Sequence, residues 1–316
     1  MPAPWRLAAT LALVVALPLQ AQHHERRTAT EEFNDAGSRI DTTIALSRGA
    51  LVDLSSFSGD IKVSSWDRDE VKIHASSRGR LRLDSSPSRV SLVESPYRGE
   101  YEDGDNDHFG YEITMPKSGR LLARSVSGDI TLRDVSDVES HTVSGGIEVT
   151  NIANRANLES VSGDVTATKV GAGLRANSVS GEIHATSISG EIAGQSVSGD
   201  IVLDDVSSSF VRTETVSGEI HFSGPVDPKG RYEFHSHSGD IDLGLASGGN
   251  DATLYVETYS GDLDSGCAMT LQPGGSGSRM GKRGTFTLGN GGGAHFSIQT
   301  FSGDVHITGC RSHGEK

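Results

Sequence analysis

The chain has 316 residues, a formal net charge of −14 and an aromatic content of only 5%. The excess of acidic residues disfavours nucleic acids and anionic membrane surfaces as partners, because both are negatively charged. Cations, basic proteins and neutral glycans remain as candidate partners. The length suits one large domain or two small ones.

Residues 1–21 have the pattern of a secretory signal peptide. Arg6 precedes a 13-residue apolar run, Leu7–Leu19, and Ala21 supplies a small residue at the cleavage point. The apolar run is too short to span a bilayer, which takes roughly 20 residues. We therefore predict export to the periplasm, the cell surface or the medium, with no transmembrane segment in the mature chain.

Residues 22–39 are expected to form a polar lead-in, after which the first strands begin. Alternation of apolar and polar residues predicts strands at Thr43–Leu54, Asp60–Ser64 and Glu70–Ala75. Residues 78–119 are acidic and lack a clear alternation. We predict an irregular insertion or a less regular coil there.

A five-residue unit of the type Val-Ser-Gly-Asp-Ile then recurs, and repetition at a fixed period is typical of repeat folds. A first copy, Phe57–Ile61, precedes the main series. Most intervals between units are 17 to 22 residues; two intervals of 9 split one period, and the final interval of 42 is a double period or a period with a long insertion. The glycines of the main series are Gly128, Gly145, Gly163, Gly181, Gly190, Gly199, Gly218, Gly239, Gly261 and Gly303.

Alternating apolar residues flank each unit. Pairs such as Ile130/Leu132 follow the Gly-Asp step, and pairs such as Ala156/Leu158 precede the unit, which predicts two strands per period with one buried face each. We expect the Val of the unit to point inward as well, so that the alternation slips by one there at a bend or bulge. The Ser or Thr before that Val is expected to have a structural role, and the glycine to provide a positive φ.

The pattern predicts an all-β fold, a single-domain β-solenoid (β-helix) of about 18–22 residues per coil over residues 40–310. Two short strands per period cannot bury their inner faces alone, whereas stacked coils share a narrow core. A β-sandwich would not need the same five residues at every turn. Residues 273–284 are expected to form a Gly-rich loop and residues 311–316 a polar tail.

The repeated units, the entry Met115-Pro116 before Val126-Ser127-Gly128-Asp129-Ile130, and the exit Leu288-Gly289-Asn290-Gly291 before Phe301-Ser302-Gly303-Asp304-Val305 resemble one group of proteins. It is a bacterial β-strand-repeat family of unknown function that is often labelled "putative adhesin". The resemblance implies a single-domain β-helix in the periplasm or at the cell surface, and it implies no catalytic residues.

The third position of the unit is acidic in almost every copy. Stacked coils would place these carboxylates about 4.8 Å apart, where like charges repel unless something offsets the repulsion. Two interpretations stay open: each carboxylate caps its own turn, or neighbouring carboxylates bind calcium or another divalent cation. The candidate cation ladder is Asp129, Asp164, Glu182, Asp200, Glu219, Asp240 and Asp262, and the same column includes Asp60, Glu191 and Asp304.

An acidic loop, Glu100–Glu112, carries Asp103, Asp105 and Asp107 at alternate positions, as the start of an EF-hand loop does. His108 stands where that loop requires glycine. We therefore interpret the segment as a solvated acidic loop.

Histidines and cysteines offer few other sites. His184, His221 and His306 share an outward position of the repeat, but the units between them carry other residues, so we do not expect a zinc site. Cys267 and Cys310 follow two units at similar offsets. In an oxidising compartment they form a disulfide if those units lie on adjacent coils, and lie too far apart if two coils separate them.

We expect an exported, non-enzymatic binding or scaffold module of the cell envelope, without a cofactor, whose partner is an envelope protein or a surface glycan. No catalytic motif is present in the sequence. One alternative is a cation-dependent adhesin that uses the acidic ladder. The alternative from another class is a glycan-active β-helix enzyme, but such enzymes need paired acids and usually exposed aromatic residues.

Overall fold

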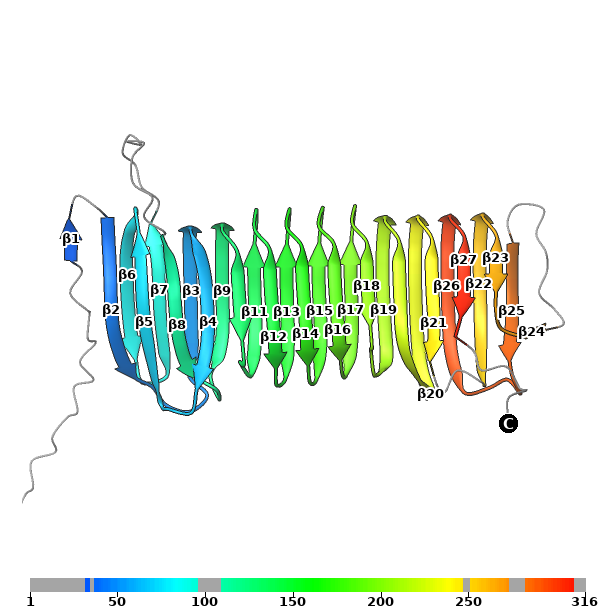
Figure 1. Cartoon of the computed structure of the whole chain (residues 1–316), viewed down its shortest axis with the longest axis horizontal. Helices are drawn as coiled ribbons and strands as arrows, with labels where there is room; N and C mark the ends of the chain where they lie inside the picture. The colour runs from blue at the N-terminus through cyan, green and yellow to red at the C-terminus, as the bar shows by residue number, and fades with distance from the viewer. Residues whose placement is uncertain (1–31, 35–36, 96–108, 247–250, 273–281, 310–316) are drawn as a thin grey trace, which may run out of the picture.

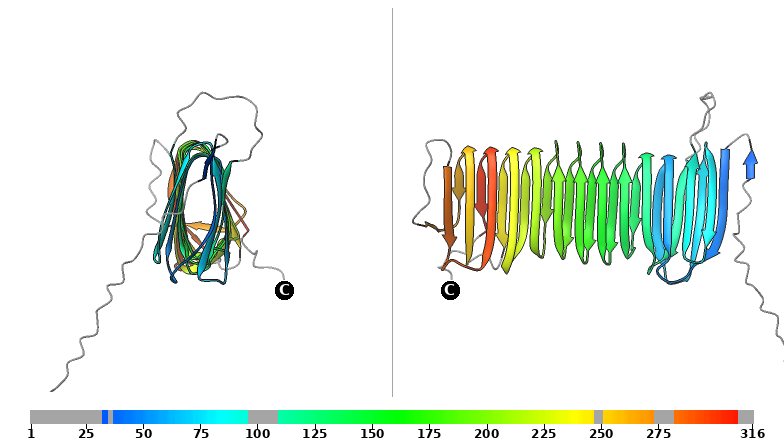
Figure 2. Two further views of the ribbon diagram at one scale, coloured as in Figure 1. Left: turned by 90° about the vertical axis from the view of Figure 1, so that its left-hand side faces the viewer. Right: turned by 180° about the vertical axis from the view of Figure 1, so that it is seen from behind.

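The computed structural model describes residues 32–34, 37–95, 109–246, 251–272 and 282–309, and these residues form β-strands and turns. Strands stack side by side along one long axis (Figure 1). Seen end-on, two facing sheets enclose a narrow, flattened section (Figure 2). The predicted all-β solenoid is confirmed.

Each coil contributes one strand to each of two sheets, here named sheet A and sheet B. Parallel strands pair at equivalent repeat positions; Ile130, for example, pairs with Ile147, and Ile147 with Val165. Sheet A contains β1 (Glu32–Asn34), β2 (Gly37–Ala45), β4 (Asp60–Trp66), β5 (Glu70–Ser77), β8 (Gly110–Pro116), β10 (Ile130–Arg133), β12 (Ile147–Ile152), β14 (Val165–Val170), β16 (Ile183–Ile188), β18 (Ile201–Asp204), the first part of β20 (Ile220–Ser238), β21 (Ile241–Ala246), β23 (Leu263–Ser265) and β27 (Val305–Thr308).

Sheet B faces sheet A across the core. At the first corner of a coil, the Ser-Gly-Asp step leads from sheet B into sheet A; the second corner leads back. Sheet B contains β3 (Leu51–Ser58), β6 (Arg80–Ser86), β7 (Arg89–Ser95), β9 (Arg120–Ser127), β11 (Asp137–Thr142), β13 (Arg155–Ser160), β15 (Gly173–Ser178), β17 (Glu191–Ser196), β19 (Ser208–Ser217), the second part of β20, β22 (Ala252–Ser260), β24 (Met269–Leu271), β25 (Lys282–Leu288) and β26 (Ala294–Ser302).

The core is a thin apolar layer between the two sheets. The pairs predicted from the alternation point inward: Ile130 and Leu132 from sheet A, Ala156 and Leu158 from sheet B, all buried. Central coils contribute mostly Ala, Val and Ile, whereas the C-terminal coils contribute Phe222, Tyr232, Phe234 and Phe296, whose rings contact one another.

The predicted phase slip at the Val of the unit is wrong. The alternation of sheet B continues without interruption, so that Ser160 points inward with 5% of its surface exposed and Val161 points outward with 43% exposed. The small hydroxyl fits the tight corner because it accepts a hydrogen bond from the backbone N–H of Gly163 at 2.9 Å. A valine at that inward position would leave the N–H without this partner.

The first-corner glycines are required for a different reason from the one predicted. Most of them do not have a positive φ. Instead, consecutive corners touch: a Cβ on Gly145 would lie well inside 3.0 Å of the carbonyl oxygen of Gly128, and one on Gly163 equally close to that of Gly145. Positive φ values occur at the second corner, at Asp134, Asn151, Lys169, Ser187 and Asp205, one residue in each of five successive coils.

Coils stack out of chain order at both ends of the solenoid. At the C-terminal end, β26 lies between β20 and β22, and β27 lies between β21 and β23, so the last coil in the chain is second from the end in space. Near the N-terminus, β3 likewise lies between β7 and β9. Antiparallel strands cover the ends, with β2, β5 and β6 at one end and β24 and β25 at the other.

Four segments differ from their prediction. β1 and the start of β2 lie within the expected polar lead-in, and the expected strand Thr43–Leu54 is divided between β2 and β3, with a turn at residues 46–50. Part of the expected irregular insertion forms β6, β7 and β8, because β7 and β8 continue the parallel pairing of β3 and β4; residues 96–108 lie outside the described residues. The last residues of the expected Gly-rich loop begin β25, while residues 273–281 are not described. Within the described part of the chain, no helix is long and apolar enough to cross a membrane.

Candidate functional site

The first corner carries a line of exposed side chains, apolar in nine of ten coils and a histidine in the other, which we name the apolar ladder. Each coil provides one, and neighbouring positions are linked by backbone hydrogen bonds such as that from Ser162 N to Val143 O, 3.0 Å. The apolar positions are each 40–47% exposed. In spatial order the ladder is Phe57, Val126, Val143, Val161, Val179, Val197, Val216, His237, Phe301 and Tyr259.

Aromatic rings replace valine at the C-terminal end of the apolar ladder. The Phe301 ring stacks against Tyr259 with centroids 4.7 Å apart and against His237 at 4.9 Å, both nearly parallel. Because the rings stack along the solenoid axis, their edges face the solvent. The predicted inward direction is wrong for Phe301 and Tyr259, which point outward.

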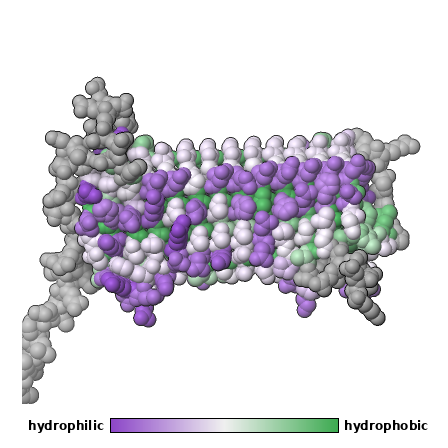
Figure 3. Space-filling view, viewed as in Figure 1, coloured by the Kyte–Doolittle hydropathy of each residue, from purple (hydrophilic) through white to green (hydrophobic). Residues whose placement is uncertain are grey.

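A column of mostly polar side chains runs beside the apolar ladder on the sheet B side, and we name it the polar column. The buried Ser and Thr residues lie between the two lines. Figure 3 shows hydrophilic and hydrophobic side chains grouped in bands along the long axis. The polar column consists of Ser55, Arg124, His141, Glu159, Asn177, Gln195, Glu214, His235, Gln299 and Glu257.

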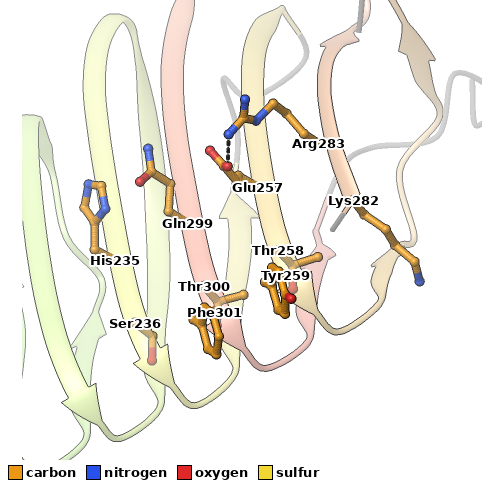
Figure 4. Close-up of a pocket in the computed structure, with 10 residues that line it drawn as sticks. All are labelled: His235, Ser236, Glu257, Thr258, Tyr259, Lys282, Arg283, Gln299, Thr300 and Phe301. Carbon is orange, nitrogen blue, oxygen red and sulfur yellow. Dashed lines mark hydrogen bonds and ion pairs between the residues drawn. The ribbon is translucent and has the colours of Figure 1, made fainter. Parts of the chain in front are cut away.

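Two hollows lie between the apolar ladder and the polar column, at equivalent repeat positions. One, of about 550 Å³, extends over the central coils from Arg124 to Val179. The other, of about 360 Å³, lies at the C-terminal end, where Gln299 lies above Phe301 and Glu257 above Tyr259, with His235 on the neighbouring strand (Figure 4). The coils of Val197 and Val216 lie between the two hollows along the first corner.

Charged pairs border the C-terminal hollow. Arg283 donates a hydrogen bond to Glu257, which lowers the pKa of that carboxyl, and Lys282 pairs with Asp262, which lowers the pKa of Asp262. Further along the polar column, the Arg212 guanidinium lowers the pKa of Glu214. These cations are therefore paired with side chains of the same surface.

The acidic residues line up on the sheet A side of the apolar ladder, as the repeat predicts, and their role is visible. The carboxylate of Asp164 accepts a hydrogen bond from the backbone N–H of Glu182 in the next coil, 2.9 Å. The expectation that each carboxylate caps its own turn is wrong, because the bonded amide belongs to the neighbouring coil. The acceptors of such bonds are Asp60, Asp129, Asp164, Asp200, Asp240 and Asp304.

Chain length separates aspartate from glutamate at these positions. Neither Glu182 nor Glu219 makes the corresponding bond to the next coil in the described part of the chain, although each donates its own N–H to the aspartate before it. The shorter side chain holds its oxygen at the height of the next corner. The acidic ladder, in spatial order, is Asp60, Asp129, Asp164, Glu182, Asp200, Glu219, Asp240, Asp304 and Asp262, with Gly146 between Asp129 and Asp164.

Glu191 does not belong to the acidic ladder. It pairs with Gly173 at the start of a sheet B strand, across the coil from the first corner. The interval of nine residues before it is half a coil, so that its Ser-Gly-Glu step forms a second corner. Among the residues that the structure describes, no group of three or more His, Cys, Asp or Glu side chains is arranged to hold a metal ion. Calcium binding by the acidic ladder stays a prediction.

Histidines on the outer face of sheet A have acidic neighbours that the chain order conceals. His184 Nε2 lies 3.8 Å from Asp204, and His221 Nε2 lies 3.7 Å from the same carboxylate. His306 is registered between Asp242 and Asp264, because its coil is inserted between theirs. The sequence contains no signal for that insertion except the interval of 42 residues.

The two cysteine-bearing coils are adjacent, since Ser265 pairs with Ile307. Cys267 is buried and disulfide-bonded. Cys310 lies outside the described residues, so its pairing with Cys267 stays a prediction. The acidic loop with Asp103, Asp105 and Asp107 and the signal peptide also lie outside them.

Comparison with known proteins gives a family and little else. Residues 103–308 match the model of the family described as Toastrack DUF4097. No curated protein matches the chain. A crystal structure of a "putative cell adhesion protein" from Clostridium sporogenes is 8% identical, over 85% of this chain and 99% of that one, with a TM-score of 0.28. A TM-score this low supports no conclusion about either fold or function.

Proposed function

This chain belongs to the Toastrack DUF4097 family, and from that premise we propose that it is an exported, non-enzymatic binding or scaffold module of the cell envelope, periplasmic or at the cell surface. The docking surface in this proposal is the first corner: the apolar ladder with the polar column on one side and the acidic ladder on the other. The proposed partners are other envelope components.

The apolar ladder is the observation that carries the proposal. Soluble proteins seldom expose a contiguous apolar surface without a binding role. Here one half-exposed apolar or aromatic side chain recurs in every coil from Phe57 to Tyr259. Neither folding of the coil nor filling of the core requires this, because a polar side chain would satisfy the same outward position.

The surface favours binding over catalysis. The hollows are open to the solvent, and the charged residues beside the C-terminal hollow are paired with one another. A glycan-active enzyme is the alternative from another class, and turnover of a polysaccharide by the purified protein would favour it over the present proposal.

Export is tested by expressing the full-length chain in a Gram-negative bacterium and fractionating the cells. We expect a processed protein in the periplasmic or surface fraction. A chain that stays in the cytosol with its first 21 residues intact contradicts the envelope proposal.

Docking is tested with a photo-crosslinking amino acid at Val143, the third position of the apolar ladder. The matched control is Glu148, an exposed residue of the same coil on the outer face of sheet A. We expect crosslinked products in intact cells from the Val143 position and few or none from the Glu148 position. Equal labelling from both positions contradicts a role for the first corner.

A further inference from the structure

We propose that the apolar ladder is the interface of a homodimer in which two copies pack side by side and parallel, related by a two-fold axis along the solenoid. The inference deepens the proposed function, on which it rests, by naming the partner of the first corner as a second copy of this chain. Periodicity, extent and charge distribution each support it.

Periodicity selects a partner with the same repeat. Positions of the apolar ladder follow one another at the spacing of strands, about 4.8 Å. An extended peptide lying along the ladder presents side chains to one side every 6.4–6.8 Å or so, and loses register within a few coils. A second copy has the same spacing, so each apolar side chain meets a counterpart along the full length.

The extent of the apolar ladder matches a specific interface. Ten coils at strand spacing give a strip roughly 43 Å long. A contact about 20 Å wide takes in the lines on either side and covers on the order of 800 Å² per copy, the usual size for a stable complex. The stacked rings of His237, Phe301 and Tyr259, with Phe57 at the opposite end, add aromatic side chains, a residue type enriched in interfaces.

The charge distribution selects the parallel orientation. A two-fold axis across the solenoids makes the copies antiparallel and sets acidic ladder against acidic ladder, nine carboxylates on each side. A two-fold axis along the solenoids sets each acidic ladder against the partner's polar column. Seven side chains of that column can donate a hydrogen bond to a carboxylate: Ser55, Arg124, His141, Asn177, Gln195, His235 and Gln299. The other three, Glu159, Glu214 and Glu257, are acidic, so three carboxylates face the acidic ladder in the parallel pair and nine in the antiparallel pair.

Self-association is isologous in this arrangement, so every residue on the axis faces its own counterpart. Val143 therefore faces Val143 of the other copy, and Val216 faces Val216. In a fully overlapped antiparallel pair, Val143 instead faces His237, and Val216 faces Val161. The two orientations thus predict different crosslinks.

Single cysteine substitutions separate these geometries. We expect Val143→Cys and Val216→Cys, each alone and in the full-length expressed protein, to form covalent dimers under mild oxidation, read by non-reducing electrophoresis and mass spectrometry. Glu148→Cys, from the same coil as Val143 but on the outer face of sheet A, is the control and should stay monomeric under the same conditions. Failure of both ladder variants to crosslink alone, or crosslinking only when Val161→Cys and Val216→Cys are mixed, overturns the parallel dimer.

Charge introduced into the apolar ladder tests the interface without a crosslink. We expect the wild-type protein to sediment as a dimer, and Val161→Asp/Val179→Asp to associate about 100-fold more weakly. Both positions are exposed, so the melting curve of the monomer should be retained. Glu148→Lys is the control and should leave the dimer intact.

Other outcomes distinguish this inference from the proposed function. A wild-type protein that is monomeric at about 0.1 mM overturns the dimer; if it then binds a glycan or a basic peptide through Val161 and Val179, the docking surface stands and its occupant is of another class. A dimer of a chain that remains in the cytosol supports the inference and removes the envelope role.

Discussion

The central coils and the C-terminal coils share one corner but enclose different cores. From β9 to β18 the first-corner glycines are 17 or 18 residues apart, the coils stack in chain order and the core holds Ala156, Ala176 and Gly194. From β20 to β27 the intervals lengthen, aromatic rings fill the core and the last coil is inserted between two others. The comparison shows that the corner determines the stacking, whereas core volume determines how much chain each coil needs.

The same contrast appears on the surface. Valine forms the apolar ladder over the central coils, and stacked rings continue it over the C-terminal coils. Two of these coils, those of His237 and Phe301, therefore carry aromatic rings both inside and outside. Among the described residues, the ring pairs in contact all lie at this end of the molecule.

The largest expected effect comes from the corner that both regions share. Gly145→Ala should lower the free energy of unfolding by about 3 kcal/mol or more, because the added Cβ collides with the backbone of Gly128, which cannot rotate away. Gly146→Ala is the matched control: its Cβ would have no neighbour closer than 3.6 Å, and the change should stay within about 0.5 kcal/mol. Urea denaturation followed by circular dichroism measures the unfolding free energy of both variants. An equal loss in the two would contradict the claim that contact between corners requires Gly145.

Next comes the aromatic core that distinguishes the C-terminal coils. The Tyr232 hydroxyl donates to Ser208 O and accepts from Asp227 N, both at 2.8 Å. Tyr232→Phe should cost about 1–3 kcal/mol of unfolding free energy, because it removes the hydroxyl partner of the buried Ser208 carbonyl and of the partly buried Asp227 N–H. Tyr255→Phe is the control, since that hydroxyl bonds to Glu257 on an outward face, and it should change the unfolding free energy by less than half as much. A similar loss in both variants would show that burial of the hydroxyl is irrelevant.

The acidic ladder should show a smaller, residue-specific effect within the central coils. Asp164→Ala removes the acceptor for Glu182 N and should cost about 1 kcal/mol of unfolding free energy. Glu182→Ala should cost less than about 0.5 kcal/mol, as expected for a surface residue without such a bond to the next coil. Melting temperatures of the two variants, measured with and without calcium, check this. If calcium stabilises the wild type and neither variant, the carboxylates act as cation ligands.

The smallest expected effect is a gain at the second corner of the central coils. Lys169 has a φ of 58°, a conformation that costs most side chains energy but that asparagine tolerates. Lys169→Asn should raise the unfolding free energy by about 0.5 kcal/mol. Lys72→Asn, in the extended strand β5, is the control and should give no gain; a gain there as well would point to charge rather than backbone conformation.

The sequence alone was sufficient for the fold and insufficient for the surface. Recurrence of one unit predicts stacked coils, and the pairs Ile130/Leu132 and Ala156/Leu158 are buried as expected. Val161 points outward and not inward as predicted, because the hydrogen bond that keeps Ser160 inside outweighs the hydrophobicity of valine. The apolar ladder, and with it the candidate docking surface, exists because the valine of each unit points outward.

The order in which the coils stack in space is the other feature that the sequence does not predict. Nothing local in the sequence indicates that the coil of His306 separates those of Asp242 and Asp264, since insertion of a coil depends on contacts between segments far apart in the chain. The prediction that Glu191 belongs to the acidic ladder was wrong for a related reason: an interval of half a coil brings a similar motif to the opposite corner.

The inserted C-terminal coil has a consequence for biosynthesis. Until residues 294–308 have been synthesised, β21 has no neighbour on its outer side and β22 has none on its inner side, so two strand edges stay open. Open edges are sites of aggregation and of attack by proteases. A chain truncated before its last coil lacks the strands that pair with these two edges. The solenoid can therefore close only after synthesis of the last coil.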